Sequence, residues 1–332
     1  MGKNKIWIIG GANMDIVGVA SHVLKDYDSN IGSISTHFGG VGRNIAQSCV
    51  EMGESVMLVT CFGCDDYGKL LKEHCDLVGI DTSFSIESST HGTSVYMAIL
   101  DEKRDMRIAM SDMSVLSEIK EDVISKAIKE MTSEDILVID SNLDVNLIDF
   151  ISKSAPAKIA SDPVSAAKIP KLKNYLDRIG IFKPNEIEAR ELTGITIIDD
   201  ETARQSLDWF LGRGIEEIII TLGSNGILFG NSERKVWITH KTVEMDNANG
   251  GGDALFGAYL SMRNKGENPI KALEVAIAVA ILKITGEFSN QNMVTYKLGI
   301  HVSEEERKEL HIKRKEKIAE EIKTLDIKER EL

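Results

Sequence analysis

Short apolar runs rich in β-branched residues alternate along this chain with segments of helical periodicity. The runs with the length of a buried strand are Ile6–Ile9, Val56–Cys61, Ile136–Ile139, Lys158–Ser161, Ile179–Phe182, Ile218–Thr221 and Gly226–Phe229. The segments with helical patterns are Asn44–Met52, Tyr67–Leu77, Leu116–Met131, Val145–Ser154, Asn185–Leu192, Thr202–Gly214, Gly252–Lys265 and Ile270–Thr285. Such alternation is typical of stacked βαβ units. It predicts an α/β fold with a mostly parallel central sheet.

Residues 16–38 and 93–110 break this alternation, because they read as strands with no helix between them. A polar turn at 101–105 separates two runs of the second stretch and predicts a hairpin. Such strands can form a small second sheet over a site or extend an edge of the central sheet. The pattern alone leaves both arrangements open.

The charge balance limits the partners of the chain. It has 332 residues, a formal net charge of −13 and a pI of about 5.1, so repulsion disfavours nucleic acid and anionic membrane surfaces. The N-terminal residues lack the apolar segment of a signal peptide, and no apolar run approaches the roughly 20 residues that span a bilayer. We expect a cytoplasmic protein that binds small molecules.

The cysteines permit two interpretations. Cys61 and Cys64 form a C-x-x-C unit, and His74 and Cys75 follow it, so a zinc ligand set can be written. No second pair of comparable spacing is present, and Cys61 ends a strand-like run. Reduced thiols in a core are the favoured interpretation.

Three glycines, Gly250, Gly251 and Gly252, precede Asp253 and an apolar segment with a helical pattern. Glycines leave backbone N–H groups uncovered, and the first N–H groups of a helix lack intrahelical partners and carry the positive end of its dipole. Such a segment binds anions. A carboxylate beside it would oppose simple binding, but it can serve as the base for a hydroxyl that attacks a phosphate. The segment therefore predicts a phosphoryl-transfer enzyme.

Asn185 and Glu188 follow a strand and a proline, at a point where Asn185 can cap the next helix. The two residues lie one turn apart on the same face, so an amide and a carboxylate point to one place. Mg²⁺ takes few protein carboxylates and keeps waters, so the pair can hold it beside nucleotide phosphates. The alternative is a capping box whose glutamate faces solvent.

Two further glycine turns are candidates for ligand contact. Thr221, Gly223 and Gly226 lie between apolar runs, where glycines permit a tight turn and close approach of a ligand, although strand–turn–strand elements of this kind are common. Gly40 and Asn44 open a helical pattern, where glycine admits a small polar molecule and the asparagine amide can bind hydroxyls.

Asn13 and Asp15 follow the first strand and supply a second pair of hydroxyl binders. Amides and acceptors without a cluster of positive charge suit a polyol better than a carboxylate substrate. The turn lacks the G-x-G-x-x-G fingerprint, so a Rossmann dehydrogenase is disfavoured. A Walker A sequence is also absent from the chain.

Residues 303–332 read as one charged helical run with a thin apolar stripe. This pattern predicts a solvated helical extension of a domain at 1–302, with an oligomer contact as the alternative.

Together the four glycine and asparagine motifs, in this order over most of residues 5–290, resemble the ribokinase-like (PfkB) carbohydrate and nucleoside kinases. The resemblance implies a three-layer α/β/α sandwich with a mostly parallel sheet, and a small β-lid from about 16–38 and 93–110. It implies ATP and Mg²⁺ as cofactors. Lids with exposed apolar residues often pair, which is consistent with a homodimer through the lid.

The resemblance also assigns a role to each motif. It makes Asp253 the catalytic base beside an anion hole formed by Gly250, Gly251 and Gly252. The residues placed on the ATP side are Asn185, Thr221, Gly223 and Gly226, with Glu188 as the magnesium ligand. The residues placed on the sugar hydroxyls are Asn13, Asp15, Gly40 and Asn44.

Within the family, residues 39–46 and 161–165 are most similar to pseudouridine kinases, so we expect phosphorylation of the 5′-hydroxyl of a ribosyl substrate. Kinases for ribose, other nucleosides or a sugar phosphate use the same machinery, and a non-catalytic sugar or nucleoside sensor could keep the fold. A sugar phosphate would require cations near the lid, for which Arg43, Arg104 and Arg107 are the candidates.

Two positions depart from the family pattern. Gly251 stands where alanine is usual, and Asn247-Ala248-Asn249 replaces the aspartate and threonine that help to hold a monovalent cation in many relatives. Phosphoryl transfer is still expected, whereas dependence on K⁺ is in doubt.

Overall fold

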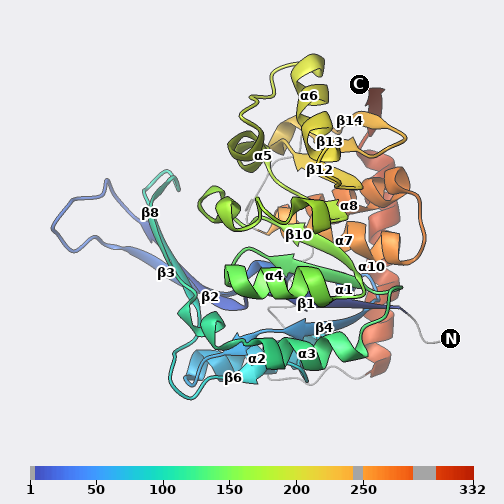
Figure 1. Ribbon diagram of the computed structural model, residues 1–332. Helices are drawn as coiled ribbons and strands as arrows, with labels where there is room; N and C mark the ends of the chain where they lie inside the picture. Colours follow the sequence, from blue (N-terminus) through green and yellow to red (C-terminus); the bar gives the residue numbers. More distant parts are fainter. Residues whose placement is uncertain (1–3, 242–249, 287–303) are drawn as a thin grey trace.

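A computed structural model describes residues 4–241, 250–286 and 304–332 (Figure 1). The strands of its large sheet are Lys5–Ile9 (β1), Ser55–Val59 (β4), Ile136–Asp140 (β9), Lys158–Asp162 (β10), Ile181–Phe182 (β11), Glu217–Thr221 (β12), Ile227–Gly230 (β13), Lys235–Thr239 (β14) and Lys328–Glu331 (β15). Within these described residues their order is β15-β14-β13-β12-β11-β10-β9-β1-β4. The strands from β4 to β12 are parallel to one another, and β13, β14 and β15 continue the sheet in antiparallel pairs.

Helices cover both faces of this sheet. They are Val41–Glu51 (α1), Asp66–Val78 (α2), Glu121–Glu130 (α3), Val145–Ser154 (α4), Glu186–Thr193 (α5), Asp200–Leu211 (α6), Gly251–Asn264 (α7), Pro269–Ile284 (α8) and Glu304–Thr324 (α10). Alternate residues of β1 divide between two cores, because side chains along a strand point to opposite faces. Ile6 and Ile8 pack in the core that includes residues of α1, α7 and α8, while Trp7 and Ile9 pack in the core of α3, α4 and α6. The predicted α/β/α sandwich is confirmed.

The strands expected to break the alternation form a second sheet. It contains Asn13–Ala20 (β2), Gly32–Gly39 (β3), Val95–Leu100 (β7) and Met106–Asp112 (β8), in the order β3-β2-β7-β8. The turn between β7 and β8 closes the predicted hairpin. The second sheet projects from the body of the molecule (Figure 1) and does not extend an edge of the large sheet. We call this sheet the lid.

Two predicted elements, the strand Val56–Cys61 and the helix Leu116–Met131, differ from the structure in their boundaries. Residues 61–62 form a short strand (β5) that pairs with Ile86–Glu87 (β6) and so leaves the line of β4. The helix expected at Leu116–Met131 is divided, because Ile119 adopts an extended conformation between a 3₁₀ turn at Ser114–Glu118 and α3.

The C-terminal prediction is wrong beyond Thr324. The chain leaves α10 there and forms β15, which pairs antiparallel with β14 at the edge of the large sheet. Ile318 and Leu325 are buried in the core of α7 and α8, so a stripe that looked thin in the sequence is used for packing. The boundary near residue 302 stays a prediction.

The cysteines do not gather into a metal site. Cys49, Cys61 and Cys75 are buried free thiols, and burial raises the pKa of Cys49 and of Cys75 to about 12. Among the residues with described positions, no group of three or more His, Cys, Asp or Glu side chains is placed to hold a metal ion. The helices of this part of the chain also include none with the length and apolar character needed to cross a bilayer.

Candidate active site

Polar residues gather where the parallel strands end. Asp140 ends β9, Asp162 ends β10, Lys183 follows β11 and Thr221 ends β12. Because these strands are neighbours and run in one direction, their carboxyl ends bring these side chains to one edge of the sheet. The loop after β1 reaches the same edge through Gly11, whose N–H donates to Asp140 Oδ2 (2.7 Å).

The N-terminus of α7 lies at this edge. Gly250 is the N-cap with φ of 78°, a left-handed conformation that favours glycine, and no side chain caps the helix there. The first intrahelical bond runs from the Ala254 N–H to the Gly250 carbonyl (2.9 Å), so the preceding N–H groups are directed out of the helix. The predicted anion hole of Gly250, Gly251 and Gly252 therefore has the geometry of an uncapped helix N-terminus.

Asp253 lies in the first turn of α7 and faces α1. Its Oδ2 accepts a hydrogen bond from Asn44 Nδ2 at 2.7 Å, across 209 residues of sequence. Burial and the nearby charge of Asp162 raise the pKa of Asp253 to about 7, while the Asn44 hydrogen bond, Lys183 and Arg43 act in the opposite direction. A carboxyl group with such a pKa can accept a proton near neutral pH.

Lys183 and Asp162 form an ion pair at the floor of the site. Their Nζ and Oδ2 atoms are 2.8 Å apart, and both side chains are 6% exposed. Nζ lies 5.7 Å from the ring centre of Phe256 and close to Gly252, where an added Cβ would lie 3.5 Å from it. The ammonium group is thus held beside the N-terminus of α7, where negative charge on a phosphoryl group would be stabilised.

A strained turn fixes Asp162. Val164 has φ of 67°, a left-handed conformation that is unfavourable for a β-branched residue. Its N–H donates to Asp162 Oδ1 (2.7 Å), which leaves Oδ2 for Lys183. Strain of this kind persists where the surrounding structure requires it, and it often marks functional sites.

Asn185 and Glu188 form a capping box, yet the glutamate does not face solvent. Asn185 Oδ1 accepts from the Glu188 N–H (2.9 Å), and Glu188 Oε2 accepts from the Asn185 N–H (2.8 Å). Glu188 is only 4% exposed, and burial together with the charge of Asp162 raises its pKa to about 6. A carboxylate that is costly to ionise gains from a cation, so the residues fit a hydrated Mg²⁺ that keeps most of its waters.

The residues predicted for the ATP side meet at the end of β12. Asn185 and Thr221 form a β-bridge, and the Thr221 N–H donates to the Pro184 carbonyl (3.1 Å). Gly226 has φ of 91°, and an added Cβ there would lie 2.1 Å from the Ile238 carbonyl oxygen, so the turn requires glycine. Gly223, with nothing within 4 Å of an added Cβ, lies open beside it.

The residues predicted for the sugar side meet at the base of the lid. Asn13 pairs with Gly39 across β2 and β3, and Asn13 Nδ2 donates to Asp15 Oδ1 (2.6 Å). Gly40 has φ of 97°, and an added Cβ would lie 2.5 Å from the Gly11 carbonyl oxygen, so the two loops touch through glycine backbone.

Asp140 clamps these two loops. It is fully buried, and its Oδ2 accepts from the N–H groups of Gly11 (2.7 Å) and Gly42 (3.2 Å). Its Oδ1 accepts from the Asn142 N–H (2.9 Å). One carboxylate thus joins the loop after β1 to the start of α1, which carry the predicted sugar-binding residues.

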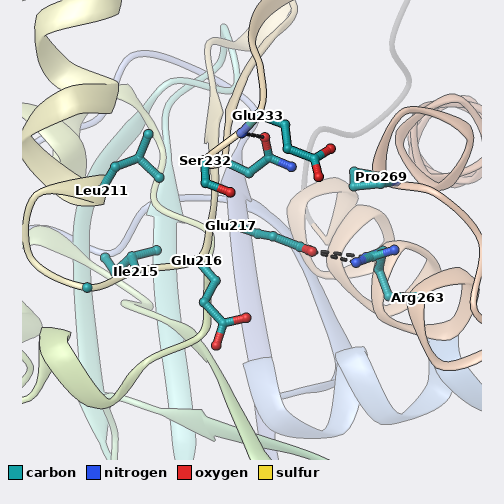
Figure 2. A pocket seen from close by; sticks show the side chains of 10 residues that line it. Leu211, Ile215, Glu216, Glu217, Ser232, Glu233, Arg263 and Pro269 are labelled. Atoms are coloured by element: carbon teal, nitrogen blue, oxygen red, sulfur yellow. Dashed lines mark hydrogen bonds and ion pairs between the residues drawn. The ribbon is translucent and has the colours of Figure 1, made fainter.

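A separate cavity of about 530 Å³ lies at the opposite end of β12 (Figure 2). Glu217, the first residue of that strand, pairs there with Arg263 through Oε1 and Nη2 (2.6 Å) and accepts from the Tyr259 hydroxyl (2.6 Å). The cavity is therefore remote from Thr221 at the carboxyl end of the strand, and it is not the site described above.

Comparison with known proteins decides the family. The pfkB family of carbohydrate kinases matches residues 3–294. This chain belongs to that family. This chain is 28% identical over 290 residues to a pseudouridine kinase of Escherichia coli strain K12. The aligned residues cover 87% of this chain and 93% of the relative.

Solved structures of other kinases share the fold. A carbohydrate kinase from Agrobacterium tumefaciens has a TM-score of 0.75 at 23% identity and covers 98% of this chain and 100% of that one. A ribokinase from Arabidopsis thaliana in complex with ribose and ATP has a TM-score of 0.74 at 20% identity and covers 85% of this chain and 93% of that one. The segment Asn247-Ala248-Asn249, on which the question of K⁺ depends, lies outside the described residues.

Asp140, Asp162 and Lys183 received no role from the sequence. Each stands at the end of a short apolar strand, and that position was a usable signal, because the ends of parallel strands meet at one edge. The sequence could not show that Asp140 accepts hydrogen bonds from two loops or that Lys183 pairs with Asp162.

Proposed function

We propose that this protein is an ATP-dependent kinase that phosphorylates the 5′-hydroxyl of a ribosyl substrate, with pseudouridine as the first candidate. The observation that carries the proposal is the position of Asp253, a buried carboxylate of raised pKa in the first turn of a helix with an uncapped N-terminus. Asn44 holds this carboxylate through a hydrogen bond. The similarity to pseudouridine kinase supports the choice of acceptor. The predicted cytoplasmic location fits a kinase of small metabolites.

In the proposed reaction, Asp253 accepts the proton of the substrate hydroxyl while the hydroxyl oxygen attacks the γ-phosphorus of ATP. ADP leaves from the opposite side of that phosphorus. The N–H groups of Gly251 and Gly252 and the ammonium of Lys183 meet the charge that develops on the transferred group. Glu188 would hold Mg²⁺ through water, and the ion would supply charge neutralisation on the nucleotide phosphates. The lid would exclude water, a competing nucleophile.

The state of Arg43 disfavours a phosphorylated sugar as substrate. Arg43 is 4% exposed, and it donates to Gly39, Gln47, Phe38 and Asn44. Arg104 and Arg107 lie exposed at the lid hairpin, where Arg107 is 3.6 Å from Asp101. An unphosphorylated nucleoside or sugar is therefore favoured.

The test is ADP release with MgATP in the presence of pseudouridine, uridine, adenosine, ribose or fructose 6-phosphate. We expect the highest kcat/KM with pseudouridine and a 5′-phosphate product by ³¹P NMR. Asp253→Ala should lower kcat on the order of 10²–10⁴-fold with the fold intact. If another acceptor is turned over and pseudouridine is not, the choice of substrate is overturned. Acceptor binding without ADP release would identify a sensor.

The lid also supports a homodimer in the proposal. Ile34 of β3 is 78% exposed, and Ile108 and Met110 of β8 are 62% and 71% exposed. Exposed apolar side chains on these lid strands favour burial against the lid of a second copy. Light scattering should report a dimer that Ile34→Glu converts to a monomer, and an unchanged mass would remove the lid from the interface.

A further inference from the structure

Arg43 is a buried cation whose acceptors among the described residues are four neutral oxygens. Nε donates to the Gly39 carbonyl (3.2 Å), and Nη1 donates to Gln47 Oε1 (2.6 Å). Nη2 donates to the Phe38 carbonyl (2.5 Å) and to Asn44 Oδ1. Burial of a guanidinium is costly when none of its described hydrogen bonds goes to a carboxylate, so its retention at this place calls for a reason.

The donors of Arg43 determine how Asn44 is turned. A guanidinium only donates, so it must meet the side-chain oxygen of Asn44, and the amide nitrogen then faces Asp253. That nitrogen donates to Asp253 Oδ2 at 2.7 Å. With the opposite orientation, two oxygens would face each other at Asp253. Arg43 therefore decides whether Asp253 receives a hydrogen bond or repulsion.

The same guanidinium holds the base of the lid. Phe38 and Gly39 are the last residues of β3, and their carbonyl groups are the acceptors of Nη2 and Nε. The Phe38 ring stacks on His74 of α2, with ring centres 4.2 Å apart. The end of the lid strand, Asn44 and Asp253 are thus joined through one side chain.

We propose that Arg43 is a positioning residue that couples the base of the lid to the catalytic carboxylate through Asn44. The proposal rests on the function proposed above for Asp253. Arg43 does not contact the reacting atoms, and it acts by fixing the orientation of Asn44 and the place at which β3 ends.

Charged and titratable groups from several elements face this network. Asp162 and Lys183 face Asp253 from the strand ends, and Lys283 faces it from α8. Arg43 is faced by Asp15 of β2, by Cys75 of α2, by Glu51 of its own helix and by Asp253 of α7. His74 also lies near Arg43, and burial lowers its pKa to about 3, so it is neutral. A variant must therefore separate the charge of Arg43 from its hydrogen bonds.

The test compares Arg43→Gln, Arg43→Lys and the control Gln47→Leu, which removes one acceptor of Arg43 and none of its bonds to Asn44 or β3. Arg43→Gln should lower kcat on the order of 10- to 100-fold with little change in the KM for ATP. It should also shift the acid limb of the kcat profile to higher pH, because a cation near Asp253 is lost. Arg43→Lys should restore the limb but not kcat, since a lysine lacks the fork that reaches two acceptors.

A double-variant cycle with Asn44→Leu tests the route. If Arg43 acts through Asn44, Arg43→Gln should have little further effect on kcat in the Asn44→Leu background. Additive losses, or a Gln47→Leu control that loses as much kcat as Arg43→Gln at matched thermal stability, would overturn the inference while the kinase assignment stands. Normal kcat in Asp253→Ala would instead overturn the proposed function. If Arg43→Gln does not fold, Arg43→Lys in the same cycle decides.

Discussion

Lys183 and Asp162 form a buried ion pair, with Nζ and Oδ2 2.8 Å apart, at the ends of two neighbouring parallel strands. Beside this pair lie two further carboxylates, Asp253 and Glu188, whose pKa values are raised partly by the charge of Asp162. The lysine is thus a counter-ion within a cluster of acids. This explains how three carboxyl groups can be kept close together before any nucleotide or cation binds.

The pair gives the first prediction. Removing one partner of a buried ion pair leaves an unpaired charge, so Lys183→Met and Asp162→Asn should each destabilise the fold by about 3 kcal/mol or more. The double variant should be less destabilised than the sum of the two. Urea denaturation of the four proteins at one pH measures the cycle. Strict additivity would show that the two charges do not interact.

Asp253 predicts how stability depends on pH. Its pKa rises from the ordinary value of 3.8 to about 7 on folding, so the folded protein holds a proton that the unfolded chain has released. This group's contribution to stability is full below about pH 4 and declines as the pH rises to about 7. Asp253→Asn removes the titration, so its stability relative to wild type should be greater at pH 8 than at pH 5. Thermal unfolding at both values checks the sign, and equal differences would contradict the raised pKa.

The hydrogen bonds of Asp140 predict that its substitution impairs binding of the acceptor but not of ATP. Asp140→Asn keeps the size of the side chain but weakens the charged hydrogen bonds to Gly11 and Gly42. Loss of about 1.5–3 kcal/mol in loop positioning corresponds to roughly a 10- to 100-fold rise in the acceptor KM. The KM for ATP should stay within about twofold. Steady-state kinetics with each substrate varied in turn distinguish this result from a general loss of folding, which would affect both.

Gly251 predicts a steric conflict with α8. An added Cβ at Gly251 would lie 2.7 Å from Ile284 Cγ2, so the alanine usual in the family does not fit beside this isoleucine. Gly251→Ala should destabilise the protein by about 1–3 kcal/mol through overpacking. In an Ile284→Ala background, Gly251→Ala should cost less stability than it does in the wild type. If Gly251→Ala alone is neutral in stability, the contact with Ile284 is not the reason for the glycine.

Much of the fold followed from short-range patterns. The β1 run, the helix at Val145–Ser154 and the hairpin around 101–105 were readable because apolar periodicity, turn residues and helix caps act over a few residues. The uncapped N-terminus of α7 also followed from three glycines before an apolar run. The strand β15 did not, because Lys328–Glu331 is charged and exposed, and only pairing with β14 makes it a strand.

Short-range patterns of residues are enough to specify the alternation of strands and helices, the glycine-rich helix start and the capping pair of Asn185 and Glu188. Three features emerge only in the folded chain: Glu188 is buried, Lys183 meets Asp162, and Asn44 turns its amide nitrogen to Asp253. The reason is physical. Local patterns depend on backbone geometry over one or two turns, whereas these contacts depend on the order in which distant strands pair and on where their ends meet.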